Sequence, residues 1–147
     1  TELLGEVGDK LRELGNEYGA TTGRPRRCGW LDLPSLRYSL QVGGVNSIAL
    51  TKIDVLDGMD EIKICTHYEH NGKKYDTLPT ADAAFMAEAK AIYETMPKWD
   101  GATFGIKDFA DFPPEAQDYV KYIEDAVGVP VEIISNGPAR EEVFYRV

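Results

Sequence analysis

Apolar residues recur at helical spacing in three stretches of the chain, and each stretch is followed by one or two glycines. The first lies within residues 3–14 and the last within residues 116–127. Between them, residues 31–44 predict a further helix, because Asp32 can accept hydrogen bonds from the free N–H groups of its first turn and Pro34 fits that turn. The spacing therefore predicts three helices, each with one apolar face.

Short apolar runs between turn-forming residues predict strands. Two of them, at 48–50 and 129–135, are apolar enough for buried strands, and each leads into polar residues. A last strand is expected over 141–147, antiparallel and at an edge. Because ligands bind at the carboxyl ends of strands in open α/β sheets, the polar residues after the two buried strands are candidates for a binding site.

Two further stretches add a hairpin and a helix. Residues 61–78 alternate on both sides of Asn71 and Gly72, a pair that tolerates the positive φ of a tight turn, and predict a β-hairpin. The alanine-rich stretch 80–93 predicts a helix. The expected fold is α/β, one unit over residues 1–147, with a partial, mostly parallel sheet, flanking helices, a β-hairpin insertion and a terminal antiparallel edge strand.

The chain is acidic, with a net charge of -9 and a pI near 4.7. This argues against a nucleic-acid binder and a membrane-surface protein, since both depend on a basic field. No apolar run approaches the roughly 18 residues that span a bilayer, and we expect no signal peptide. Cys28 and Cys65 lack the spacing of a redox pair, which favours reduced thiols and a cytoplasmic protein. His67 and His70 would face opposite sides of a strand, so we expect no metal site there.

A basic loop follows the first helix and reads GATTGRPRRCGW over 19–30. Its arginines present planar forks that pair with carboxylate or phosphate, its threonines add hydroxyls, and its central glycine lets backbone N–H groups approach an anion. These residues are Thr21, Thr22, Gly23, Arg24, Arg26 and Arg27. They indicate a ligand with several negative oxygens. The alternative is a surface loop that pairs with the chain's own carboxylates.

The residues TKID, Thr51 to Asp54, come directly after the first buried strand. Guanine presents two N–H donors on one edge, and a single carboxylate such as Asp54 can accept both, which adenine does not allow. The aliphatic stem of Lys52 can lie along a purine face. The alternative interpretation is a strand end with solvated charges.

The second buried strand ends in Ser135, Asn136 and Gly137, which could enclose a purine or a ribose; the alternative is an ordinary turn. The sequence contains no glycine-rich phosphate loop of the common nucleotide-binding type, and no residue stands out as a nucleophile with its base. A complete small GTPase is therefore rejected, because nothing would hold the phosphates.

Four segments of the chain resemble the C-terminal third of the adenylosuccinate synthetase family: GNEYGATTGRPRRCGWLD, LTKIDVLDG, IYETMPKW and ISNGPAREE. The resemblance covers essentially all 147 residues. It implies a ligase of purine biosynthesis that joins L-aspartate to inosine monophosphate (IMP) and hydrolyses GTP, with magnesium, to form adenylosuccinate. In this reaction GTP would phosphorylate the 6-oxygen of the hypoxanthine ring, and the aspartate amine would then displace it.

The resemblance also implies roles for individual residues. The loop that closes on aspartate would be Ala20, Thr21, Thr22, Gly23, Arg24, Pro25 and Arg26. Within it, Arg24 would also touch IMP and Arg26 would reach GTP. The guanine-contacting residues would be Lys52, Ile53, Asp54, Ser135, Asn136 and Gly137.

The family's general-base aspartate, catalytic histidine, magnesium-binding loop and phosphate-binding glycines have no counterpart in this sequence. We therefore expect a C-terminal fragment of the ligase, inactive alone, from an enzyme that is a homodimer at full length. The alternative is a free-standing, non-catalytic module that binds a guanine nucleotide or another anion. No nucleic-acid or membrane partner is expected for either.

Overall fold

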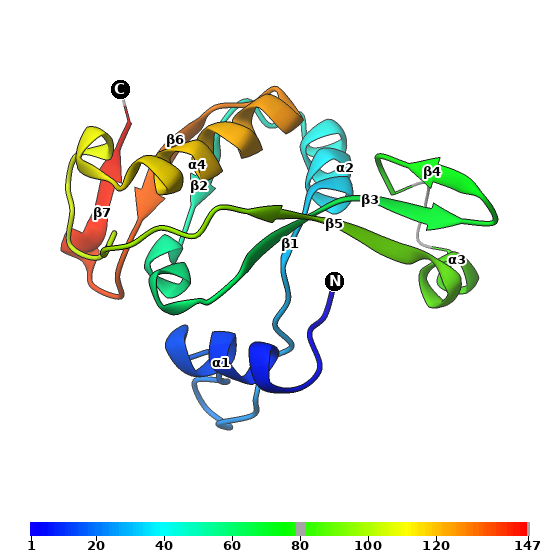
Figure 1. Cartoon of the computed structure of the whole chain (residues 1–147), viewed down its shortest axis with the longest axis horizontal. Coiled ribbons are helices and arrows are strands. Elements are labelled where there is room, and N and C mark those ends of the chain that lie inside the picture. Colours follow the sequence, from blue (N-terminus) through cyan, green and yellow to red (C-terminus); the bar gives the residue numbers. More distant parts are fainter. Residues whose placement is uncertain (79–81, 147) are drawn as a thin grey trace.

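The computed structural model describes residues 1–78 and 82–146 (Figure 1). Its α-helices are α1 (Glu6–Leu14), α2 (Leu33–Gly43), α3 (Ala83–Glu88) and α4 (Pro114–Val127). Single 3-10 turns are η1 (Ile53–Gly58), η2 (Phe109–Asp111) and η3 (Arg140–Glu142). The strands are β1 (Leu31–Asp32), β2 (Ile48–Leu50), β3 (Ile62–His70), β4 (Lys73–Tyr75), β5 (Lys90–Met96), β6 (Val131–Ser135) and β7 (Val143–Tyr145).

The strands form two mixed sheets, flanked by helices. In one, β3 pairs in parallel with β1 and antiparallel with β4 and β5; in the other, β6 pairs in parallel with β2 and antiparallel with β7. The α/β class is confirmed. The expected single, mostly parallel sheet is instead two sheets, because the long strand β3 takes partners of its own and the β2–β6 pair stays separate.

The hairpin and the edge strand are confirmed. β3 and β4 pair antiparallel across Asn71 and Gly72, whose φ angles are 49° and 71°. β7 pairs antiparallel with β6 and ends its sheet.

The helix expected over 80–93 is wrong for most of its length. Residues 79–81 lie outside the described part of the chain, the helix α3 begins after Asp82, and Lys90–Met96 forms the strand β5. β5 runs antiparallel to β3 from the pair Ile62 and Met96 to the pair Glu69 and Lys90. Pairing with a neighbouring strand therefore overrides the helical preference of the alanines.

The expected helix ends are observed in α2 and α4. The Asp32 carboxylate accepts a hydrogen bond from the backbone N–H of Ser35 at 2.9 Å, and Pro34 lies in the first turn of α2. Gly44 and Gly128 follow the two helices with left-handed φ angles of 59° and 70°, which glycine adopts without steric cost.

One hydrophobic cluster contains buried side chains from both sheets and from α4. The α4 members face the core with one side of the helix: Ala116, Tyr119, Val120 and Ile123. In Figure 1 α4 crosses the sheet that contains β2 and β6. The helix α1 and the loop after it lie apart from that layer, below η1 in the same view. This arrangement brings the end of α1 and the residues after it next to the end of β2, where Lys52 contacts Gly15 and Glu17.

Candidate functional site

The first site residue, Lys52, follows β2 in a left-handed backbone conformation with a φ of 62°. Residues with a side chain rarely adopt this conformation, and it marks places where the surrounding structure fixes the backbone. The Lys52 ammonium donates to the carbonyl oxygen of Gly15 at 2.7 Å and to the Glu17 carboxylate at 2.5 Å. Gly15 ends α1, so the ammonium lies where the helix dipole favours a cation.

The basic loop folds back on itself. Tyr18 and Pro25 form an antiparallel bridge, and inside it the backbone N–H of Gly19 donates to the carbonyl of Arg24 at 2.8 Å. The N–H of Arg24 donates to the hydroxyl of Thr22 at 3.3 Å. Residues 20–27 are all exposed, so the loop presents its side chains to solvent.

Two of the three arginines pair with the chain's own carboxylates. Arg26 donates to Glu17 at 2.8 Å, and Arg27 donates to Glu2 at 2.7 Å. Within residues 1–78 and 82–146, Arg24 forms no ion pair, and its guanidinium remains available at the tip of the loop. Arg26 and Arg27 therefore pair with the chain's own carboxylates, which was the alternative interpretation of the basic loop.

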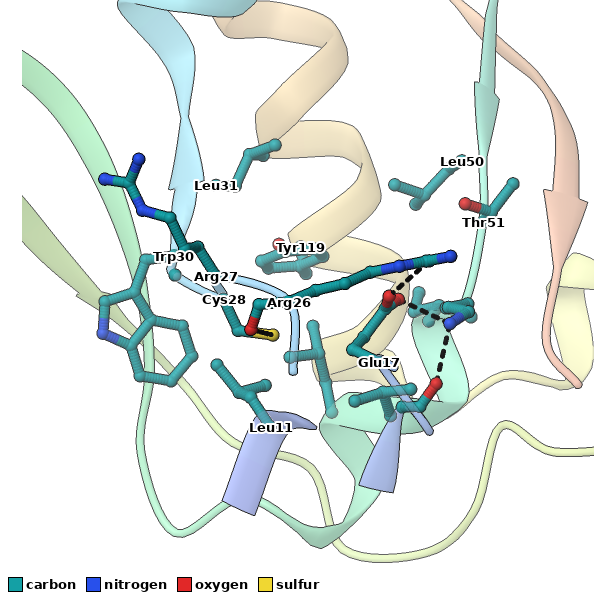
Figure 2. Close-up of a pocket in the computed structure, with 16 residues that line it drawn as sticks. Leu11, Glu17, Arg26, Arg27, Cys28, Trp30, Leu31, Leu50, Thr51 and Tyr119 are labelled. Carbon is teal, nitrogen blue, oxygen red and sulfur yellow. Dashed lines mark hydrogen bonds and ion pairs between the residues drawn. The ribbon is translucent and has the colours of Figure 1, made fainter. Parts of the chain in front are cut away.

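Glu17 lies between Arg26 and Lys52 and contacts both (Figure 2). The Lys52 ammonium, and next to it the Arg26 guanidinium, lower the pKa of the Glu17 carboxyl below its ordinary value. A single carboxylate thus joins the basic loop to the residue that follows β2.

A cleft of about 440 Å³ lies at this junction (Figure 2). Arg26, Lys52 and Ile53 line it together with a mostly apolar wall of Leu11, Trp30, Leu31, Leu50, Val55, Leu56 and Tyr119. The volume is within the range of small-molecule sites, and apolar walls with a few convergent polar groups are typical of them. The structure therefore brings part of the basic loop and part of the TKID segment to one cleft, while the tip of the loop, from Ala20 to Pro25, stands outside its lining.

Asp54 lies in the first turn of η1 with an unusual environment for a carboxylate. Among the described residues its Oδ1 atom is buried and accepts no hydrogen bond. Burial raises the pKa of Asp54 above its ordinary value, and the nearby carboxylates of Asp57 and Glu142 raise it further. The described residues therefore leave this oxygen atom without a donor.

The residues after β6 lie close to those after β2, because the two strands are parallel neighbours with Leu50 opposite Ile134. Asn136 is fully buried and its Nδ2 donates to the carbonyls of Thr103 at 2.5 Å and Ile106 at 2.8 Å. Its Oδ1 is buried and, within the part of the chain that the structure describes, has no donor. The Asn136 side chain therefore fixes the 103–106 loop and leaves one acceptor free.

Ser135 and Gly137 form a tight turn after the strand. The Ser135 hydroxyl donates to the carbonyl of Gly137 at 3.2 Å. A Cβ atom on Gly137 would lie 2.3 Å from a carboxylate oxygen of Glu142 and 2.9 Å from the ring of Phe104. A side chain at this position would therefore require the ends of the Glu142 and Phe104 side chains to shift.

Sequence reasoning missed Glu17 and the role of the Asp57 side chain. Asp57 lies in η1 and accepts hydrogen bonds from the Trp99 indole at 2.7 Å and from the Thr103 backbone N–H at 2.8 Å. The one signal for Glu17 was its place beside a basic loop in an acidic chain. The partners of Glu17 and of Asp57 lie far from them in the sequence, so no spacing rule could have identified either role.

The described ranges, 1–78 and 82–146, contain no group of three or more His, Cys, Asp or Glu side chains placed to bind a metal ion. In the same ranges, no helix has both the length and the apolar character needed to cross a bilayer.

Comparison with known proteins relates the whole chain to one family. The sequence model of adenylosuccinate synthetase matches residues 1–144. Among curated proteins, the adenylosuccinate synthetase of Aquifex aeolicus is 52% identical over 145 residues, which are 99% of this chain and 33% of that protein. The adenylosuccinate synthetase of Halothermothrix orenii is 47% identical over 146 residues, or 99% of this chain and 34% of that protein.

A solved structure agrees with these relatives. The structure of a fully ligated adenylosuccinate synthetase from Plasmodium falciparum superposes with a TM-score of 0.95 at 35% identity, over 100% of this chain and 35% of that one. The chain spans about a third of the length of the curated relatives it matches. The chain belongs to the adenylosuccinate synthetase family.

Proposed function

We propose that this chain is the part of a GTP-dependent ligase that binds aspartate and the guanine ring. The whole ligase would join L-aspartate to IMP, with GTP as co-substrate, and so form adenylosuccinate in the synthesis of AMP. The observation that carries the proposal is the shared cleft: Arg26 of the basic loop and Lys52 and Ile53 after β2 line one cavity in a member of this family.

Asp54 would read the guanine edge. Its buried Oδ1 has no donor among the described residues, and an orphaned buried acceptor costs about 1–3 kcal/mol until a donor reaches it. The N1–H and the 2-amino group of guanine are such donors, arranged for one carboxylate. The Lys52 stem would pack along the purine, and Ser135, Asn136 and Gly137 would contact the ring from the neighbouring strand end.

The basic loop would close on the aspartate substrate. The loop residues are Ala20, Thr21, Thr22, Gly23, Arg24, Pro25 and Arg26, all exposed. Arg24 would also contact IMP, and Arg26 would reach toward GTP. Because Arg26 is paired with Glu17, an incoming carboxylate or phosphate would compete with that residue for the guanidinium.

The chain by itself would bind ligands without turning them over. The general base, the histidine, the magnesium-binding loop and the phosphate-binding glycines that the resemblance implies have no counterpart in this sequence. We place Mg²⁺ binding in the part of the family's chain that this sequence does not cover. A cytoplasmic homodimer is the expected form of the whole ligase.

The test is a hybrid synthetase, in which this sequence is joined to the other two-thirds of the Aquifex aeolicus relative. The hybrid synthetase should form adenylosuccinate from IMP, L-aspartate and GTP with Mg²⁺, whereas the 147-residue chain alone should form none. A folded hybrid that binds neither GDP nor aspartate would overturn the proposal. Product formed by the 147-residue chain alone would contradict its non-catalytic role.

A further inference from the structure

Glu17 holds two cations that come from different segments of the proposed site. Its Oε1 accepts from the Lys52 ammonium at 2.5 Å and its Oε2 accepts from Arg26 at 2.8 Å (Figure 2). Its side chain is only one quarter exposed, so solvent screens these pairs less than it would screen ordinary surface ion pairs.

The backbone of Glu17 is fixed on both sides as well. Its N–H donates to the carbonyl of Arg12 in α1 at 2.8 Å, and its carbonyl accepts from the N–H of Arg26 at 3.0 Å. The carbonyl of Arg26 in turn accepts from the Arg12 guanidinium at 2.9 Å. If the Glu17 carboxylate moves with one of the two cations, its contact with the other must therefore change.

We propose that Glu17 is a positioning residue that couples aspartate binding in the loop to guanine binding after β2. The inference rests on the proposed function. When an anionic ligand draws Arg26 away, Glu17 keeps a single partner and holds Lys52 more firmly. The Lys52 side chain then loses less conformational entropy when a purine packs on it, so the purine binds more tightly. By thermodynamic linkage, the nucleotide must tighten aspartate binding by the same factor.

The experiment measures this factor in the hybrid synthetase. GDP is titrated by calorimetry with and without saturating L-aspartate, with IMP present throughout, and GDP replaces GTP so that no turnover occurs. We expect aspartate to tighten GDP binding by at least about fivefold in the parent, the lower end of usual coupling. In Glu17→Gln the factor should fall below about twofold. The reverse titration, aspartate with and without GDP, should give the same factor.

Two variants separate coupling from a structural role. Glu13→Gln removes the same charge from an exposed position in α1 and should keep the parent's factor. Glu17→Asp keeps the charge but is one methylene too short to contact both cations, so it should also lose the coupling. If Glu17 were only structural, its variants would weaken both ligands while the ratio between the two conditions stayed at the parent's value.

The outcomes divide cleanly between the two proposals. If the parent binds neither ligand, the proposed function fails and this inference fails with it. If the parent binds both ligands but shows no coupling, or if Glu17→Gln or Glu17→Asp keeps the factor, this inference alone is overturned. Should Glu17→Gln not fold, the Glu17→Asp result decides.

Discussion

Asp57 accepts the indole N–H of Trp99 at 2.7 Å, across 42 residues of chain, and so ties η1 to the loop that approaches Gly137. The same carboxylate accepts the backbone N–H and the hydroxyl of Thr103 at 2.8 and 2.9 Å. Asn136 holds this loop from its other side. Asp57 and Asn136 are therefore connected through hydrogen bonds to Thr103, in addition to the sheet.

Removal of the Asp57 acceptor should destabilise the fold. In Asp57→Ala, four donors lose this acceptor: the Trp99 indole, the backbone N–H and hydroxyl of Thr103, and the backbone N–H of Phe104. We expect a loss of about 2–4 kcal/mol in the free energy of unfolding. Urea denaturation followed by tryptophan fluorescence measures it. The matched control is Asp60→Ala, whose exposed ion pair with Lys10 should leave the midpoint nearly unchanged. Equal effects of the two substitutions would remove Asp57 from this structural role.

Asp54→Asn should change nucleotide preference in the hybrid synthetase. The variant loses one of two acceptors for the guanine N–H groups, and we expect GTP binding to weaken by about 2–4 kcal/mol. The new amide can donate to the 2-oxo group of xanthine, so xanthine nucleotides should gain relative to GTP. Competitive titration with the two nucleotides measures both effects. Unchanged preference would take Asp54 out of base recognition.

The same substitution should stabilise the ligand-free chain in a pH-dependent way. Burial raises the pKa of Asp54, so the folded state holds its proton at pH values where the unfolded state, with a pKa of about 3.9, has lost it. The contribution of Asp54 to stability therefore falls as pH rises from the unfolded pKa through the raised folded pKa. The melting temperature of Asp54→Asn relative to the parent should rise over that window and stay level above it. A constant difference at all pH values would contradict this.

Gly137→Ala should disturb the turn after β6. The new methyl would lie 2.3 Å from a Glu142 oxygen and 2.9 Å from the Phe104 ring, so one of them must move. We expect a lower melting temperature and weaker GDP binding. Gly43→Ala is the control, because its methyl would meet a Val45 methyl at 3.1 Å inside α2, where alanine favours the helix. The control should be neutral or slightly stabilising.

Arg26→Leu should impair the use of aspartate by the hybrid synthetase. The guanidinium is the proposed clamp for the substrate's negative oxygens, so the KM for aspartate should rise strongly, kcat should fall, or both. Arg27→Leu removes the same charge from the neighbouring position, where the side chain pairs with Glu2, and should have a smaller effect. Steady-state kinetics with aspartate varied measures the difference. If Arg26→Leu kept the kinetic constants of the parent, the loop would have no role in aspartate binding and would be an ordinary surface loop.

Local signals in the sequence predicted local structure. The cap at Asp32, the glycine after α4 and the Asn71–Gly72 turn each depend on residues within a few positions of one another, and the structure has all three. The strand β5 was missed because its identity depends on β3, nearly thirty residues away, and not on its own alanines. Pairing between distant strands leaves little trace in a single sequence.

The candidate site divides in the same way. The TKID segment and the residues after β6 could be singled out because charged or polar residues follow an apolar run, and the parallel β2–β6 pair brings them to one sheet edge. The role of Glu17 could not be predicted, because it depends on the contact with Lys52, which lies 35 residues away in the sequence. The buried role of Asn136, which holds the 103–106 loop, was hidden for the same reason.

The left-handed backbone of Lys52 has one more consequence. The left-handed conformation costs a lysine about 1 kcal/mol or more in conformational free energy, a cost that a glycine would not have. This conformation places its ammonium at the end of α1, where it contacts Gly15 and Glu17. A substitution of Lys52 by glycine would remove this conformational cost. It would also remove the contacts of the ammonium with Gly15 and Glu17, and with them the side chain that is proposed to pack along the purine.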